Sequence, residues 1–485
     1  MGDPRACKLL QTTTNQKNMK ENSSGSTLYL MGITAVAILG GLLFGYDTAV
    51  ISGAEQALQQ FFQGAKDFEY TASLHGMTAS SALAGCIIGG ALSGFLANRF
   101  GRRNSLIIAA CLFFCSALGS FNPEFLFFTY GEPTANLLVA FNIYRVIGGI
   151  GVGLASAVCP MYIAELAPAN IRGTLVSCNQ FAIIFGMLVV YFVNYSIKNS
   201  LEGAEAMIEI GWRRMFLSEA VPAGLFGLLL FLVPKTPRYL AMMGREKDAL
   251  VVLTRINGES TAKRILEDIK ITTREKNQPL LSFGIAVVAI GVLLSIFQQA
   301  IGINVVLYYA PRIFENMGAT GDVAMLQTVV MGIVNILFTV VAIVTVDKLG
   351  RKPLLIVGSI GMLIGMVALG ALSFMNQIGI AALIFIVIYT ASFMMSWGPI
   401  CWVLISEIFP NTIRGKAVAI AVAAQWLANY AVSSTFIPLS EWSLGGTYLV
   451  YAMFCLLSII FVWKWVPETK GKSLEDMTRL WQERK

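Results

Sequence analysis

Charged residues are scarce in this chain. Of its 485 residues only 13% are Asp, Glu, Lys or Arg, whereas 56% are hydrophobic. A soluble globular protein carries about 25% charged residues, so this chain has too little polar surface to cover several soluble domains. The same composition excludes an intrinsically disordered chain, which combines low hydrophobicity with high net charge. A polytopic membrane protein is the class that remains.

Histidine and paired cysteines are lacking too. The only histidine is His75, which excludes histidine-rich metal centres and proton relays. The 8 cysteines lie in apolar stretches or in the polar N-terminal tail, and none falls in a loop that we place outside the membrane. We therefore expect no disulfide framework and interpret most of these cysteines as small buried apolar side chains.

Enzyme motifs are absent as well. Gly149-Ile-Gly-Val-Gly153 resembles part of a dinucleotide fingerprint, but it lies within an apolar helix and follows no strand. Gly471-Lys-Ser473 resembles the end of a phosphate-binding loop, yet Val466 stands where that loop needs its first glycine. The sequence predicts no enzyme, no bound metal and no cofactor.

Long apolar runs are what the chain does contain. Strand-type alternation is missing, and a spanning helix needs about 20 apolar residues, which these runs supply. We predict an all-α fold of twelve transmembrane helices. The runs fall at 28–52, 72–97, 105–121, 135–162, 172–197, 213–233, 282–308, 322–346, 353–374, 380–406, 415–438 and 446–466.

The cations are distributed unevenly over the loops. Most of the 35 Lys and Arg residues lie in the two tails, in 234–280 and in the loops on that same side. By the positive-inside rule both termini then face the cytoplasm of a plasma (inner) membrane. The net charge of +7 faces the inner leaflet and indicates no nucleic-acid partner. The opposite loops hold only Lys66, Lys198, Arg213, Arg214 and Arg312, and Arg145 alone lies inside a run.

The chain also repeats itself. Glu165-Leu-Ala-Pro-Ala-Asn-Ile-Arg172-Gly173 recurs about 242 residues later as Glu407-Ile-Phe-Pro-Asn-Thr-Ile-Arg414-Gly415. Half the chain is about as long, so a six-helix unit is duplicated, and such bundles place the substrate between their halves at the membrane midplane. The predicted parts are a cytoplasmic tail at 1–27, a six-helix half at 28–233, a cytoplasmic helical linker at 234–280, a second half at 281–467 and a cytoplasmic tail at 468–485.

Several motifs in order resemble the sugar porter family of the major facilitator superfamily, over about residues 28–476. Within that family the chain is most similar to the bacterial D-xylose–proton symporters. The motifs are Gly-Gly-Leu-Leu-Phe-Gly-Tyr-Asp47, Arg99-Phe-Gly-Arg-Arg103, Tyr144-Arg145-Val-Ile-Gly-Gly149, the two Glu…Arg-Gly motifs, Gln298-Gln299-Ala-Ile-Gly-Ile-Asn304 and Pro467-Glu-Thr-Lys-Gly471.

Three positions depart from the family pattern. Asn98 stands where the superfamily usually has Asp in the first Arg-rich loop, which is expected to weaken a cytoplasmic gate contact. Lys235 replaces the acid of the family's Pro-Glu-Ser-Pro-Arg motif. Met187 stands where the xylose symporters have a sugar-contacting glutamine, so the resemblance implies a site that is not restricted to xylose.

Three ionisable residues lie deep inside apolar runs, namely Asp47, Arg145 and Glu219. A charge at the bilayer centre costs about 2.5–3.5 kcal/mol on insertion scales, so such residues face the bundle interior and pair. One interpretation is a static ion pair that fixes packing. The other is a protonation switch, in which a changing distance to Arg145 binds or releases a proton. The resemblance favours the switch, because proton-coupled members of the family keep an acid at the position of Asp47.

Amide and aromatic side chains inside the runs predict the cargo. A neutral polyol needs amides for its hydroxyl groups and aromatic faces for its C–H surface, although a single amide would equally serve as interhelical glue. Gln299 and Asn304 would lie about 140° apart on an unbroken helix, so we expect a break near Gly302. Gly398-Pro399 predicts a second break. The predicted substrate-binding residues are Phe44, Gln180, Gln298, Gln299, Asn304, Tyr308, Asn335, Phe393, Gly398, Trp402, Gln425 and Trp426.

Ionic motifs recur at helix ends on the cytoplasmic side. Their plain interpretation is topology determination. The resemblance implies in addition a salt-bridge network between the halves, which closes the inner side and breaks on opening. The residues are Arg99, Arg102, Arg103, Glu165 and Arg172 in the first half, and Lys348, Arg351, Lys352, Glu407 and Arg414 in the second.

Residues and resemblance together predict proton-coupled symport of a monosaccharide by alternating access, with D-xylose foremost and D-glucose or related sugars as further candidates. The expected partners are the sugar, the proton and the lipid bilayer, and we expect a monomer. A sugar uniporter of the same fold is the alternative, and Asp47 argues against it. An organic-phosphate antiporter would need unpaired arginines in the pocket, whereas Arg145 has acidic neighbours. A non-transporting sugar sensor usually carries a large signalling tail, and residues 465–485 are short.

Overall fold

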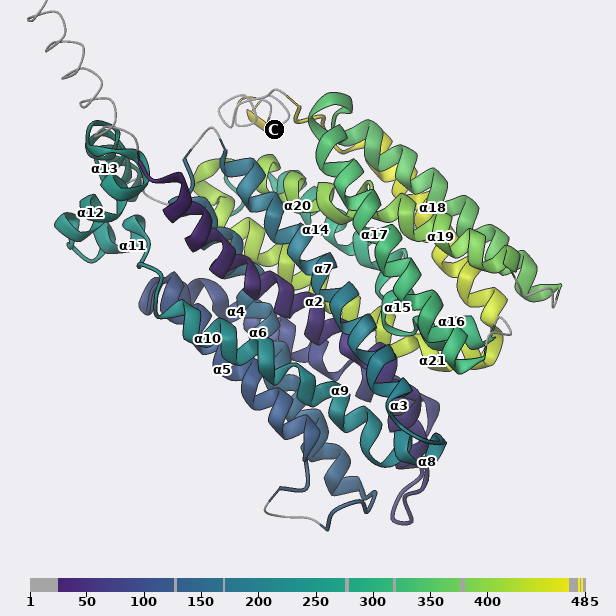
Figure 1. Ribbon diagram of the computed structural model, residues 1–485. Coiled ribbons are helices and arrows are strands. Elements are labelled where there is room, and N and C mark those ends of the chain that lie inside the picture. The colour runs from purple at the N-terminus through teal and green to yellow at the C-terminus, as the bar shows by residue number, and fades with distance from the viewer. Residues whose placement is uncertain are drawn as a thin grey trace, which may run out of the picture.

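The computed structural model is a bundle of long helices (Figure 1). In the described part of the chain no strand occurs, which confirms the all-α prediction. The structure describes residues 25–125, 129–168, 171–274, 279–316, 320–375, 380–470, 479 and 481–482.

The first half of the chain forms most of one side of the bundle. The first helix in the described residues begins at Thr27, because the hydroxyl of Ser26 accepts a hydrogen bond from the N–H of Tyr29 and caps the helix. The helices are α2 (Thr27–Gln63), α3 (Ala72–Ala79), α4 (Ser81–Arg99), α5 (Arg102–Phe121), α6 (Ala135–Leu166), α7 (Arg172–Asn199), α8 (Ala204–Ala206), the π-helical turn η1 (Met207–Gly211), α9 (Trp212–Ser218) and α10 (Ala220–Leu230).

Three short helices follow in the predicted linker, namely α11 (Pro237–Met242), α12 (Glu246–Asn257) and α13 (Glu259–Arg274). Their apolar faces pack on one another around a small core of their own, which includes Leu253 and Leu266. Figure 1 shows them at the end of the bundle where the C-terminus also lies. We call this end the terminal end, and the opposite end, with α3 and α8, the far end.

The second half of the chain forms most of the other side of the bundle. Ser443 has non-helical dihedral angles (φ −164°, ψ 106°) inside its last helix, which therefore holds two predicted runs, 415–438 and 446–466. The helices are α14 (Ile285–Ala300), α15 (Ile303–Tyr308), α16 (Ala310–Asn316), α17 (Gly321–Leu349), α18 (Arg351–Phe374), α19 (Ile380–Met394), α20 (Trp397–Ile408) and α21 (Asn411–Lys464).

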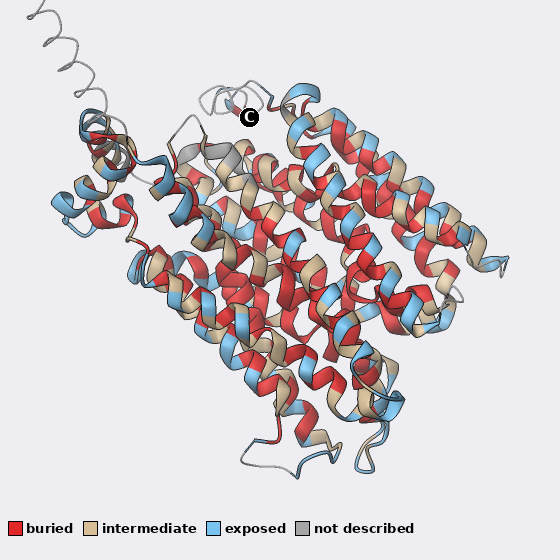
Figure 2. Cartoon of the chain, in the orientation of Figure 1, coloured by how far each residue is buried: buried red, intermediate tan, exposed pale blue. Residues whose placement is uncertain are grey.

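Within the described residues, 10 helices are long and apolar enough to cross a membrane. Twelve runs were predicted, and two of them do not appear as separate spanning helices. The sixth run is divided at Glu219 into α9 and α10, and α21 carries the last two runs as one helix. Apolar side chains such as Phe95 and Leu228 are exposed, as a lipid-facing surface requires. Figure 2 shows buried residues concentrated between the helices.

The two halves meet along a seam in the middle of the bundle. Helices α2, α4 and α7 of the first half contact α15, α17 and α21 of the second. Tyr191 donates from its hydroxyl to the backbone oxygen of Leu307 across this seam (2.9 Å). The candidate site lies between these helices.

Candidate functional site

The predicted break in the seventh apolar run is present at Gly302. α14 ends at Ala300, Gly302 adopts a left-handed conformation with φ 90°, and α15 begins at Ile303. Glycine takes up this φ without the steric cost that a Cβ atom imposes. As a result Asn304 Nδ2 donates a hydrogen bond to Gln299 Oε1, a pairing that a continuous helix would prevent.

The second predicted break lies slightly before Gly398-Pro399. α19 ends at Met394 and α20 begins at Trp397, with Ser396 at φ −135° and ψ −90° between them. Pro399 thus belongs to the first turn of α20, where a missing N–H costs nothing and the fixed φ of proline suits the helix. The proline starts the new helix instead of ending the old one.

A cavity of about 60 Å³ lies between the halves. Of the predicted substrate-binding residues, all except Asn335 line it. Asn335 is buried in α17 but outside the lining. Ordinary ligand pockets have roughly 300–1,000 Å³, so a sugar can enter only if the halves move apart. The lining residues are Phe44, Gln180, Ile183, Ile184, Met187, Gln298, Gln299, Ile303, Asn304, Leu307, Tyr308, Phe393, Met394, Gly398, Trp402, Gln425, Trp426 and Asn429.

Asn429 is a polar lining residue that our sequence analysis missed. Its Nδ2 donates to the hydroxyl of Tyr308 (3.4 Å), and its Oδ1 accepts from the hydroxyl of Ser433 (3.1 Å). Asn429 follows Gln425 by four residues in α21, and residues with that spacing lie on one face of a helix. This spacing was the signal that could have identified it.

Gln298 is the hub of the amide network in this cavity. Its Nε2 donates to the backbone oxygens of Trp397 (2.9 Å) and Gly398 (3.3 Å), at the start of α20. Its Oε1 accepts from Nε2 of Gln425 and from Nε2 of Gln299 (3.3 Å). The glutamine side chains from α14 and α21 therefore hold one another in fixed orientations.

Among the described residues, two buried polar atoms of the cavity lining have no hydrogen-bond partner and can bind a ligand. Gln425 Oε1 and Trp426 Nε1 are buried without a hydrogen-bond partner in the described part of the chain. A buried polar group left without a partner costs about 1–3 kcal/mol, which a ligand hydroxyl would recover. The rings of Phe44 and Trp426 lie 5.4 Å apart across the seam, so an aromatic surface accompanies the polar groups. This combination suits a neutral polyol.

The three ionisable residues predicted to pair are brought together near this cavity. Arg145 Nη1 donates to the Asp47 carboxylate, and Nη2 donates to the Asp47 backbone oxygen (3.1 Å). Glu219 is fully buried, and neither of its carboxylate oxygens has a hydrogen-bond partner among the described residues. It lies close enough to interact electrostatically with both Asp47 and Arg145.

The charges of this cluster do not balance when all three groups are ionised. Asp47 and Glu219 would contribute two negative charges and Arg145 one positive charge. An unpaired buried charge costs several kcal/mol, so the neutral cluster, with one proton on its carboxylates, is strongly favoured. The arrangement can therefore hold one proton and release it when the spacing changes.

Comparison with known proteins places the fold and the site in a family. The sequence model of the family described as "Sugar (and other) transporter" matches residues 33–481. The D-xylose-proton symporter of Escherichia coli K12 is 53% identical over 480 residues, which cover 95% of this chain and 97% of that protein. The chain belongs to the sugar transporter family of the major facilitator superfamily. It is accordingly a multi-pass membrane transporter and not an enzyme.

Relatives within this family differ in what their names say about energy coupling. The glucose facilitated diffusion protein of Zymomonas mobilis is 38% identical over 96% of this chain and its own full length. Among solved structures, the partially occluded inward open conformation of the E. coli xylose transporter XylE superposes with a TM-score of 0.84 at 52% identity. That match covers 92% of this chain and 100% of the other.

The ionic motifs at the terminal end pair within each half of the transporter. Arg102 Nη2 lies 2.8 Å from Glu165 Oε1 in the first half, and Arg351 Nη2 lies 3.0 Å from Glu407 Oε1 in the second. The side chain of Arg172 lies outside the described residues. The predicted network between the halves stays a prediction for a state that is closed at this end.

Glu468 completes the cluster of the second half. Its carboxylate accepts hydrogen bonds from the backbone N–H groups of Arg351 (3.1 Å) and Lys352 (3.0 Å), the first two residues of α18. Partial burial disfavours its charge, but these bonds and those from Thr469 and Lys470 outweigh it and lower the pKa of Glu468. A carboxylate at this position also interacts favourably with the helix dipole.

Replacing Gly302 with alanine is expected to cost about 1–3 kcal/mol of stability and to weaken sugar binding. The added Cβ would lie 2.7 Å from the ring of Tyr451, on a backbone with φ 90°. Relaxing that strain would straighten the break and separate Gln299 from Asn304. Gly94→Ala in α4 is the control, because its Cβ meets nothing within 4 Å. Thermal unfolding of both variants tests this, and equal midpoints would contradict it.

Proposed function

We propose that the protein is a proton-coupled symporter of a monosaccharide that works by alternating access. One observation carries the proposal above all others. A cavity suited to a neutral polyol adjoins a buried cluster that needs one proton for neutrality. Phe44 lines the cavity one turn before Asp47 in α2, and Tyr308 of the lining interacts electrostatically with Asp47 and Arg145. Closure around a sugar can therefore alter the spacing of the charged groups.

The sequence of events follows from electrostatics. Separating Arg145 from Asp47 favours a proton on the carboxylate, and restoring the contact favours its release. Glu219 is the acid that can take over Arg145 while Asp47 is protonated. One proton that crosses 100 mV carries about 2.3 kcal/mol, which sustains roughly 50-fold accumulation of a neutral solute.

The orientation proposed for the molecule puts its terminal end in the cytoplasm. The concentration of Lys and Arg in the tails, the linker and the loops of that side supports this for a plasma (inner) membrane protein. Contacts between the halves at the far end, Gln56 with Glu315 (2.7 Å) and Lys198 with Asp322 (3.2 Å), support an inward-facing conformation. We propose that the transporter works as a monomer.

D-xylose is the first candidate for the sugar. The name of the 53% identical relative supports it, and Met187 argues for a broader preference, because this lining residue offers no hydrogen bond donor. A site that makes fewer hydrogen bonds to the sugar loses less binding free energy when a sugar with a different arrangement of hydroxyl groups binds. We therefore include D-glucose and related sugars among the substrates.

Purified protein in liposomes tests coupling and substrate together. Adding D-xylose to symporter liposomes should draw protons inward and make a weakly buffered medium more alkaline. Sugar equilibration without any pH change would instead establish the uniporter alternative. D-Glucose should compete with labelled xylose, as should galactose or arabinose, and competition by xylose alone would contradict the broad preference.

A further inference from the structure

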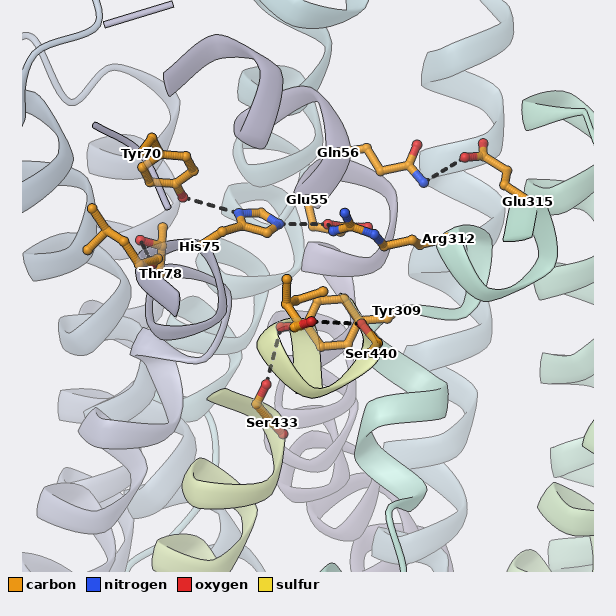
Figure 3. Close-up of polar contacts among 12 residues, drawn as sticks. Glu55, Gln56, Tyr70, His75, Thr78, Tyr309, Arg312, Glu315, Ser433 and Ser440 are labelled. Carbon is orange, nitrogen blue, oxygen red and sulfur yellow. Dashed lines mark hydrogen bonds and ion pairs between the residues drawn. The ribbon is translucent and has the colours of Figure 1, made fainter. Parts of the chain in front are cut away.

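The only histidine of the chain belongs to a buried ionic cluster (Figure 3). The cluster lies at the far end, about two turns along α2 from Asp47. His75 Nε2 lies 2.8 Å from Glu55 Oε2, and both side chains are fully buried. Arg312 Nη1 donates to the same carboxylate oxygen (3.2 Å). The hydroxyl of Tyr70 lies 3.1 Å from the other ring nitrogen, Nδ1.

This cluster joins the two halves of the transporter. Glu55 lies in α2 and His75 in α3 of the first half, whereas Arg312 lies in α16 of the second. Gln56 donates to Glu315 of α16 beside it (2.7 Å). Both contacts are possible only while the far end is closed, because they connect parts that separate when the halves tilt apart.

Several elements contribute ionisable or polar side chains to the surroundings of Glu55 and His75. The segment before α3 contributes Tyr70, and α16 with the residue before it contributes Tyr309, Arg312 and Glu315. Helix α21 packs on α3, and its Ser433 accepts from the hydroxyl of Tyr309 through its backbone oxygen (3.3 Å). Glu315 lines a separate cavity of about 510 Å³ and is held by Gln56.

In the closed state the charges balance without a proton on the histidine. Arg312 neutralises Glu55, and a neutral imidazole satisfies both of its neighbours. Its Nε2–H then donates to Glu55 while Nδ1 accepts from the Tyr70 hydroxyl. Oε1 of Glu55 has no partner among the described residues, so the carboxylate depends on these two contacts for its stabilisation.

Opening the far end removes Arg312 and leaves the carboxylate with His75 alone. Histidine is the side chain that ordinarily gains its charge between about pH 5 and 8. We propose that Glu55, His75 and Arg312 form a second proton-binding site, in which Arg312 and a proton on His75 alternate in neutralising Glu55. The site binds a proton on opening and releases it on closing. This inference rests on the proposed alternating access.

The direction of the pH effect follows from linkage. A proton that binds better to the open state favours that state, so acid should open the far end. Uptake of one proton limits the effect to about tenfold per pH unit. Since the proposed orientation turns the far end outward, acid outside would favour the state that accepts sugar from outside.

A distance measurement across the far end tests the site without relying on transport. Spin labels on Lys66→Cys and Val323→Cys, both exposed, report the separation of the halves after the 8 native cysteines are replaced. An Asp47→Asn background removes the other proposed proton site. Between pH 8 and pH 5.5 the ratio of open to closed populations should rise several-fold per pH unit. A ratio that does not change with pH would overturn the proposal.

Three variants separate the proton site from a structural role. His75→Gln should make the ratio independent of pH, because a neutral donor remains but no proton binds. Arg312→Gln should do the same, because His75 then stays protonated in both states. Gln56→Ala, the control, breaks a neighbouring contact between the halves and should raise the ratio at every pH while keeping its slope. A slope that persists in His75→Gln would also overturn the proposal.

Failure of the second proton site can be distinguished from failure of the proposed symport function. A transporter without sugar-driven proton movement would fail the liposome test whether or not the labels respond to pH. Conversely, a coupled symporter whose far end ignores pH would contradict only the second proton site.

Discussion

Asp47→Asn is expected to abolish uphill sugar accumulation while sugar exchange continues. The wild-type protein should concentrate sugar up to roughly 50-fold at 100 mV, and the variant should reach only equal concentrations on both sides. The physical reason is the charge count of the cluster. With a neutral amide in place of the Asp47 carboxylate, Glu219 alone balances Arg145, and no proton is needed in either conformation. The variant should fold because Arg145 keeps an anionic neighbour.

Uptake and counterflow in liposomes measure this difference. The matched control is Glu124→Gln, which breaks the buried ion pair of Glu124 with Arg213 in the same half. That pair does not line the cavity, so its loss should lower stability without removing coupling. Sugar-driven proton uptake that persists at the wild-type level in Asp47→Asn would disprove the assigned role of Asp47.

Gln298→Ala is expected to raise the Kd of the sugar by roughly two orders of magnitude, which corresponds to about 2.7 kcal/mol. Gln298 orients the amides of Gln299 and Gln425 and holds the start of α20 through two backbone oxygens. Each buried hydrogen-bond partner of Gln298 that is left unpaired costs about 1–3 kcal/mol. In addition, the amides of Gln299 and Gln425 lose the orientation in which they would bind the sugar.

Asn335→Ala provides the comparison for this substitution. Asn335 is as fully buried as Gln298, with 2% of each residue exposed, but it does not line the cavity. Its loss should change the Kd by less than about threefold. Isothermal titration with D-xylose on both purified variants decides the matter, and similar affinities for the two would remove Gln298 from the site.

The conformation of the two halves affects the sugar affinity that each of these variants will show. The halves are in contact at the far end, and the cavity is too small for a sugar. Sugar binding must therefore select a wider conformation, and any substitution that weakens the far-end contacts changes the apparent affinity as well. Affinities of variants should for this reason be compared together with the separation of the halves.

Features of this protein that depend on local chemistry can be predicted from its sequence. The positions of the apolar runs follow from the cost of burying polar groups in lipid, and the break at Gly302 follows from a glycine between two amides that must meet. Deeply placed ionisable residues are rare in spanning helices, so Asp47, Arg145 and Glu219 could be recognised as a set before their contacts were known.

Contacts between distant parts of the chain were decided only by the tertiary structure. Asn335 and Asn429 are both buried amides in apolar helices, yet helix rotation turns only Asn429 into the cavity lining. In the sequence, His75 is a single histidine within the predicted run 72–97, and Arg312 is a cation of a predicted loop. Their meeting at Glu55 depends on how the two halves pack, because Arg312 is 257 positions from Glu55 in the chain. The sequence by itself therefore determined the class of protein and identified the few charged residues inside its apolar helices. Tertiary packing determined which of the charged residues pair with one another.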